Sequence, residues 1–158
     1  MLFLVVLTAC SIQEKSEDSV KIGDIVAVHY TGTLDDGTLF DTSEGKEALK
    51  FKVGSGEMIR GFDQAVIGMK VGEEKDITLQ PSEAYGAWDP KRVSTQPREN
   101  VETNEELRAG MTLMAIAPDG GQMPVKVLNV SEDTVTVDLN HPLAGKILHF
   151  NIKVVGKE

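Results

Sequence analysis

The chain has 158 residues, of which 41% are hydrophobic and 26% charged, close to the averages of globular proteins. This length provides for one ordinary domain, or for a small domain with a smaller one inserted in it. The formal net charge of −9, with no cluster of Lys or Arg, excludes nucleic acid as a partner, because binding through phosphates requires a basic patch.

Residues 1–9 form a short apolar run that ends immediately before Cys10, the only cysteine of the chain. Leu7 and Ala9 stand three residues and one residue before Cys10, as in the cleavage site of a bacterial lipoprotein signal. The pattern predicts that Cys10 becomes the lipidated first residue of the mature protein. Two or more acyl chains would anchor the protein stably in a membrane of the cell envelope, on its extracytoplasmic side.

Two alternatives for this segment stay open, because no Lys or Arg precedes the apolar run and the run is short. The true start could lie upstream, or the run could be the first strand of a cytoplasmic protein. Residues 10–19 are polar, and they predict a flexible tether between an anchor and the folded part of the chain.

The folded part begins near Val20 with strand-forming patterns. Residues 25–34 are rich in strand-forming residues and predict a β-strand, which a hairpin-type turn at 35–38 follows. Residues 49–53 alternate between apolar and basic side chains, as in a strand with one solvent-exposed face.

The next predicted element is a short helix at 58–66, where apolar residues recur at helical spacing. Residues 75–79 predict a strand, which ends at Pro81. Alternating apolar and polar residues at 148–154 predict a closing strand near the end of the chain.

Residues 88–140 differ in composition from the segments on either side. They contain three strand-like stretches, at 111–116, 124–130 and 134–137, and one possible helical turn at 104–107. A structureless loop of this length inside a compact domain would be far outside the usual range. We therefore predict an inserted β-rich domain at 88–140, with the main domain formed by residues 20–87 and 141–158.

Four short strings, taken in order and spacing, resemble the FKBP family of peptidyl-prolyl cis/trans isomerases. They read VHYTG at 28–32, DGxxFDxS at 36–43, IRGF at 59–62 and AYG at 84–86. The insertion after this last string, and NHPLAGK at 140–146, resemble the SlyD-like branch in particular. The resemblance implies a mainly β (α+β) fold: a twisted antiparallel sheet around a short helix, with a small insert-in-flap chaperone domain.

The resemblance also implies an apolar cleft between the sheet and the helix, at which X-Pro bonds rotate. The family's catalytic positions carry over to Tyr30, Phe40, Asp41, Ile59, Phe62, Tyr85 and Phe150, and Leu49 and Met58 are expected to contact substrate beside them. Without the family strings, the aromatic residues would be interpreted as ordinary core and Asp41 as a turn carboxylate. Phe62 stands where many members of the family carry Trp.

The chemistry of prolyl isomerisation suits these residue types. The X-Pro bond rotates over a barrier of ~18–20 kcal/mol, because amide resonance holds it planar. The twisted state has lost this resonance and is less polar, so a dry aromatic pocket favours it over the planar amide. Tyr85 could donate a hydrogen bond to a substrate carbonyl, while Asp41 would position side chains and shape the local field. No covalent bond breaks, and we expect no cofactor.

Several methionines and aliphatic residues surround one predicted hairpin of the insertion. The candidates for contact with a client polypeptide are Met111, Leu113, Met114, Ile116, Met123 and Val125. Flexible, methionine-rich surfaces suit the promiscuous binding of apolar chain segments. The resemblance implies that the insertion binds unfolded, proline-containing polypeptides and delivers them to the cleft. A holdase without catalysis and an adhesive scaffold remain as alternatives, and we expect a monomer.

The three histidines, His29, His141 and His149, do not share a metal-binding spacing. We therefore predict no metal site.

Overall fold

A computed structural model of the chain describes residues 19–103, 106–116 and 120–158. The predicted signal segment, Cys10 and all but the last residue of the predicted tether lie outside these residues. The predicted helical turn at 104–107 lies partly outside them. Across the described residues, no helix is both long and apolar enough to span a bilayer.

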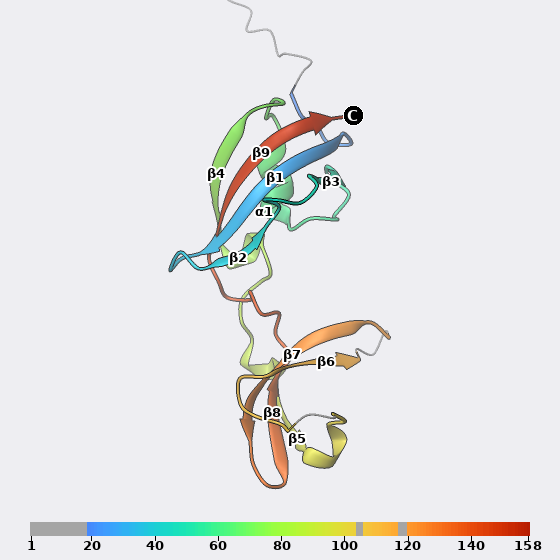
Figure 1. Ribbon diagram of the computed structural model, residues 1–158, viewed down its shortest axis with the longest axis vertical. Helices are drawn as coiled ribbons and strands as arrows, with labels where there is room; N and C mark the ends of the chain where they lie inside the picture. The colour runs from blue at the N-terminus through green and yellow to red at the C-terminus, as the bar shows by residue number, and fades with distance from the viewer. Residues whose placement is uncertain (1–18, 104–105, 117–119) are drawn as a thin grey trace, which may run out of the picture.

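The first sheet wraps around the helix α1 (Arg60–Val66) at one end of the molecule (Figure 1). Its central strand β1 pairs with three antiparallel neighbours, and the last of these pairs with β4. The strands are β1 (Ile25–Leu34), β2 (Leu39–Thr42), β3 (Leu49–Lys52), β4 (Glu74–Leu79) and β9 (Leu148–Lys157). Sheet and helix together enclose the core of this part of the chain.

Strict alternation of side chains explains why β9 forms here. Leu148, Phe150, Ile152 and Val154 are all buried, while the residues between them are half-buried or exposed. Successive side chains of a strand point to opposite faces, so this pattern places one apolar face on α1.

The helix α1 begins at Arg60, two residues later than the apolar spacing predicts, because Ile59 is the N-cap and its backbone is not helical, with φ −57° and ψ 142°. Phe62 and Val66 are buried on its inner face. Gly61 is needed for its approach to β4, since a Cβ atom there would lie 2.5 Å from Cδ2 of Leu79. The glycine thereby fixes how closely the helix packs on the sheet.

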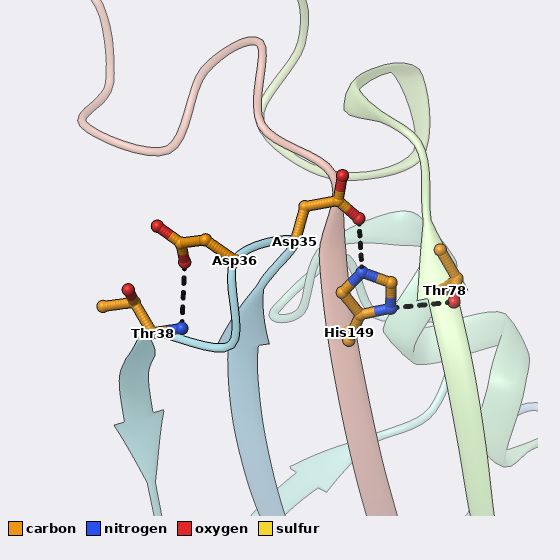
Figure 2. A network of polar contacts seen from close by, with 5 residues as sticks. All are labelled: Asp35, Asp36, Thr38, Thr78 and His149. Carbon is orange, nitrogen blue, oxygen red and sulfur yellow. Dashed lines mark hydrogen bonds and ion pairs between the residues drawn. The ribbon is translucent and has the colours of Figure 1, made fainter.

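A polar network covers part of the outer face of the first sheet (Figure 2). The imidazole of His149 lies between Asp35, whose Oδ1 is 2.9 Å from Nε2, and Thr78, whose Oγ1 is 3.0 Å from Nδ1. Asp36 accepts the backbone N–H of Thr38 at 2.9 Å and closes the turn between β1 and β2. The network joins this turn to β9 and β4.

The second sheet lies at the other end of the elongated molecule (Figure 1). Its strands follow the order β5 (Val93–Pro97), β8 (Thr134–Asp138), β7 (Gln122–Val130) and β6 (Thr112–Ile116), all antiparallel. A separate apolar core, to which Val125, Val127 and Val135 contribute, holds it together. Short 3₁₀ turns occur at Pro81–Glu83, Pro90–Arg92 and Arg98–Asn100.

The described part of the chain thus has two antiparallel sheets and one short α-helix, which confirms the predicted mainly β fold. The strands predicted at 25–34, 49–53, 75–79 and 148–154 are present in the first sheet, and those predicted at 111–116, 124–130 and 134–137 in the second. β2 and β5 were not predicted. The strands of the second sheet all lie in one stretch of chain between β4 and β9. The proposed domain boundaries stay a prediction.

Candidate functional site

Aromatic rings from β1, β2, β3, β9 and α1 pack against one another in the first sheet. We call this set the aromatic cluster: Tyr30, Phe40, Phe51, Phe62 and Phe150. The ring centroid of Phe62 lies 5.2 Å from that of Phe150 and 5.7 Å from that of Tyr30, both edge to face. Such pairs add about 0.5–1.5 kcal/mol each beyond the burial of area, and they fix the ring orientations. Tyr30 and Phe40 remain half-exposed at the margin.

Gly32 makes room for two of these rings. A Cβ atom at this position would lie 2.6 Å from Cζ of Phe40 and 3.0 Å from Cε1 of Phe150. The glycine of the VHYTG string therefore lets both rings lie directly against the β1 backbone. The string drew attention to Gly32, but it gave no indication of this role.

The hydroxyl of Tyr30 donates a 2.6 Å hydrogen bond to Oδ2 of Asp41 on the neighbouring strand β2. The other carboxylate oxygen of Asp41 accepts the backbone N–H of Thr42 at 2.8 Å. Burial of the ring, together with the hydrogen bond and the negative charge of Asp41, raises the pKa of Tyr30 to about 12. Tyr30 is therefore a neutral hydrogen-bond donor at physiological pH.

Ser43 holds the backbone of Tyr30 through hydrogen bonds. Its buried hydroxyl accepts the Tyr30 N–H at 2.8 Å and lies 3.1 Å from Nδ1 of His29. Its own N–H donates to the Tyr30 carbonyl at 3.0 Å. Ser43 thus gives the last position of the DGxxFDxS string a structural role, which sequence reasoning did not assign.

Tyr85 stands just after the 3₁₀ turn Pro81–Glu83, with 38% of its surface exposed. Burial of its ring, and then the negative charge of Asp41, raise the pKa of Tyr85 above its usual value. Its hydroxyl makes no hydrogen bond to any residue that the structure describes. The group is therefore a protonated donor that is available to a ligand near Asp41.

The remaining residues predicted for the cleft lie beside the aromatic cluster. Leu49, Met58 and Ile59 are half-buried and pack against the core of the first sheet. Phe51, which contacts Phe62 at 5.9 Å between centroids, was not predicted. It lies on the buried side of β3, and its alternating neighbours gave no signal beyond that of a core residue.

The residues predicted to contact a client fall mostly around one groove of about 830 Å³ on the second sheet. The predicted members that line it are Leu113, Met114, Ile116, Met123 and Val125. Met114 is 60% exposed and Ile116 79% exposed, whereas Val125 is buried. Met111 lies outside the groove, where its sulfur accepts the backbone N–H of Arg108.

The histidines are separated in space. His29 contacts Ser43, His149 contacts Asp35, and His141 lies flat on the ring of Tyr85 with 3.8 Å between centroids. Within the ranges that the structure describes, no group of three or more His, Cys, Asp or Glu side chains could hold a metal ion. The contact of His141 with Tyr85 was not predicted, because no local pattern connects residues so far apart in the sequence.

Comparison with known proteins gives the same family throughout. A family model of the FKBP-type peptidyl-prolyl cis-trans isomerase matches residues 16–155. The chain is 41% identical over 150 residues to the short-type peptidyl-prolyl cis-trans isomerase of Methanocaldococcus jannaschii, covering 85% of this chain and 92% of the relative. It is 36% identical over 140 residues to the FKBP-type 16 kDa peptidyl-prolyl cis-trans isomerase of Escherichia coli K12. This match covers 87% of this chain and 93% of the relative.

A third relative, the FKBP-type peptidyl-prolyl cis-trans isomerase SlyD of Aeromonas hydrophila, is 39% identical over 130 residues, which cover 82% of this chain and 60% of the relative. The antiparallel sheet around a short helix, the aromatic cluster and these matches define an enzyme that isomerises prolyl peptide bonds. The chain belongs to the FKBP-type peptidyl-prolyl cis-trans isomerases. Its substrates are proline-containing polypeptides.

Proposed function

We propose that this isomerase is a folding chaperone, which captures unfolded polypeptide segments on its second sheet and rotates their X-Pro bonds at the aromatic cluster. The observation that carries the proposal is the apolar groove around Met114 and Ile116. Large apolar side chains that are exposed together are a typical sign of a binding surface.

The groove suits chain segments of varied sequence. Its methionines, Met114 and Met123, have flexible side chains that adapt to differently shaped apolar groups. The strand β6, which lines it, has no second neighbour among the strands of the described residues. An extended client could therefore pair with the β6 backbone, and such hydrogen bonds do not depend on the client's sequence.

At the aromatic cluster, catalysis would come from stronger binding of the twisted X-Pro bond than of the planar one. The rings of Tyr30, Phe40 and Phe62 supply a water-poor surface for the less polar twisted amide. The free hydroxyl of Tyr85 would donate to a carbonyl of the substrate and hold the chain while the prolyl ring turns. Asp41 would orient Tyr30 and contribute its negative field, without transferring a proton.

The proposal includes a membrane anchor at Cys10, for which the apolar run 1–9 and the order of Leu7, Ala9 and Cys10 are the support. The polar residues after Cys10 would hold the enzyme at the extracytoplasmic face of a membrane. Mass spectrometry of the mature protein should find an acylated Cys10 at the amino terminus. The Cys10→Ser variant should no longer be recovered with the membrane fraction. An unmodified Met1 would contradict the anchor.

The chaperone role is tested by separating two substrates, a short proline peptide and a protein whose refolding is limited by prolyl isomerisation. A double variant, Met114→Ser with Ile116→Ser, changes two exposed side chains and should alter stability little. We expect it to keep its kcat/KM on the peptide but to lose most of the acceleration of protein refolding. Ile22→Ser, which changes a 73% exposed residue outside the groove, is the matched control.

Each outcome of this test discriminates between hypotheses. Full refolding activity in the double variant would contradict capture by the groove. If the wild-type protein suppresses aggregation without accelerating refolding, the holdase alternative is correct instead.

A further inference from the structure

The flat stack of Tyr85 on His141 differs from every other ring contact in the described residues. Its centroid distance is 3.8 Å and its interplanar angle is 4°, whereas the pairs of the aromatic cluster are tilted or edge to face. The stack covers one face of a side chain whose hydroxyl is unpartnered and lies in the field of Asp41. Rotation of the Tyr85 ring is thereby restricted by a residue that follows the second sheet.

The ring of His141 is itself held by its own turn. The backbone N–H of Leu143 donates to Nδ1 of His141 at 3.1 Å, and the N–H of Ala144 donates to the His141 carbonyl at 2.8 Å. Because Nδ1 accepts a hydrogen bond, it carries no proton in this arrangement. Burial lowers the pKa of His141, which also favours the neutral imidazole.

Two chain segments connect the sheets, and hydrogen bonds join them to each other close to His141. We call these contacts the clamp, formed by Trp88, Asp89, Asp138 and Asn140. The buried Asn140 side chain accepts the N–H of Asp89 at 2.9 Å and donates to the Asp89 carbonyl at 2.9 Å and to Oδ1 of Asp138 at 2.6 Å. Nε1 of Trp88 donates to the other oxygen of Asp138 at 2.8 Å.

A backbone contact closes the arrangement next to Tyr85. The N–H of Gly145 donates to the carbonyl of Gly86 at 2.8 Å. Tyr85 and His141 thus each lie beside a point at which the two connecting segments are hydrogen-bonded to each other. The stack is a part of this junction and not an isolated surface contact.

We propose that His141 is a positioning residue of the isomerase: it holds the Tyr85 ring so that its hydroxyl is aimed at a substrate carbonyl, and the clamp holds His141. The inference rests on the donor role proposed above for Tyr85. Asp138 is the last residue of β8, so the second sheet is connected to Tyr85 through the hydrogen bond of Asp138 with Asn140 and the stack of the next residue, His141, on the Tyr85 ring.

The test measures kcat/KM on a short proline peptide, which does not need the groove. His141→Ala should lower kcat/KM ~5- to 10-fold, which corresponds to about 1–1.4 kcal/mol of lost transition-state stabilisation. His141→Phe keeps an aromatic face for the stack and should recover most of the activity. His149→Ala, which removes a histidine on the outer face of the sheet, is the matched control and should retain wild-type activity.

A double-variant cycle separates positioning from general damage. If His141 acts through the Tyr85 hydroxyl, His141→Ala should cost little further activity when Tyr85→Phe is already present. Independent, multiplicative losses would overturn the proposal, as would wild-type activity in His141→Ala. Fluorescence of Trp88, the only tryptophan, and thermal unfolding verify that each variant is folded.

Ring proton resonances of the two tyrosines provide a readout that is independent of activity. The Tyr85 resonances, assigned with Tyr85→Phe, should be shifted by the ring current of His141 and should lose this shift in His141→Ala. If Tyr85→Phe has wild-type activity, the donor role fails, whereas unshifted Tyr85 resonances in the wild-type protein would overturn the positioning role itself.

Discussion

The hydrogen bond of 2.6 Å from the Tyr30 hydroxyl to Oδ2 of Asp41 connects β1 and β2 at the edge of the aromatic cluster. It pairs a neutral phenol with an exposed carboxylate, and it leaves Tyr85 as the tyrosine with a free hydroxyl within the described residues. The two tyrosines of the chain therefore have different tasks: Tyr30 holds Asp41, and Tyr85 is available to a ligand.

Replacing Asp41 by Asn should lower the pKa of Tyr30 from about 12, because both the charged acceptor and its negative field are lost while burial remains. The absorbance of the ionised phenol during an alkaline titration measures this change. Tyr30→Phe identifies the signal of Tyr85, whose pKa is also raised above 10. An unchanged titration in Asp41→Asn would contradict the pairing.

Gly32→Ala should lower kcat/KM on a proline peptide while the protein stays folded. The added methyl group would displace the ring of Phe40, which is half-exposed and can move, at a cost of about 1–3 kcal/mol in the free energy of unfolding. Peptide kcat/KM and urea unfolding measure the two effects. Gly156→Ala is the control in the same sheet, since its Cβ atom would make an ordinary contact of 3.5 Å with Ala27. Equal effects of both substitutions would contradict a role for the close approach at Gly32.

Asn140→Ala should destabilise the protein by about 1–3 kcal/mol, because it leaves the N–H of Asp89 without its partner, while the Asp89 carbonyl still accepts the N–H of Arg92 at 3.0 Å. The fluorescence of Trp88 should change as well, since Asp138 loses the side chain that orients it. Asn129→Ala, at an exposed position of β7, should stay within about 0.5 kcal/mol of wild type. Urea unfolding measures both variants, and equal stabilities would contradict the clamp.

Protonation of His141 in mild acid should lower the free energy of unfolding of the protein. Burial lowers the pKa of His141 below 6.5, so the unfolded chain takes up a proton at a higher pH than the folded one. The contribution of His141 to stability is therefore complete above pH 6.5 and is lost as the pH falls from there towards the pKa of the folded protein. The other charged groups around the cavity that His141 lines are Asp138, Lys126 and Lys146, and the Tyr85 ring is stacked on the imidazole.

Urea midpoints measured from neutral pH into mild acid verify this expectation. The decline should be smaller in His141→Phe, which cannot be protonated at this position, than in the wild-type protein. A decline of the same size in His141→Phe and in the wild-type protein would assign the acid sensitivity to other groups.

Side-chain alternation was sufficient to predict the main strands of the first sheet. β1 and β9 bury alternate apolar residues, and this period of two is visible in the sequence. β5 was missed because its middle residues, Ser94, Thr95 and Gln96, are polar. It exists through pairing with β8, where the hydroxyls of Thr95 and Thr136 lie 2.9 Å apart. Such a strand depends on tertiary partners and not on its own pattern.

In the candidate site, too, local sequence patterns predicted some features, whereas others depend on the tertiary structure. Family strings identified Tyr30, Phe40 and Phe62 as a group, and the structure brings these rings together through Phe150. The stack of His141 on Tyr85 joins two segments separated by the whole second sheet. Contacts of this kind depend on how the sheets are connected, which no local pattern describes.

The hydrogen bond between Gly145 and Gly86 brings the outgoing and returning connections together at a single point. All strands of the first sheet lie outside the stretch between these two glycines. The segment between the two glycines could therefore be replaced at a single point of the chain without changing any strand of the first sheet. If the second sheet captures clients as we propose, such a replacement would change which polypeptides the enzyme acts on, while the aromatic cluster stays as it is.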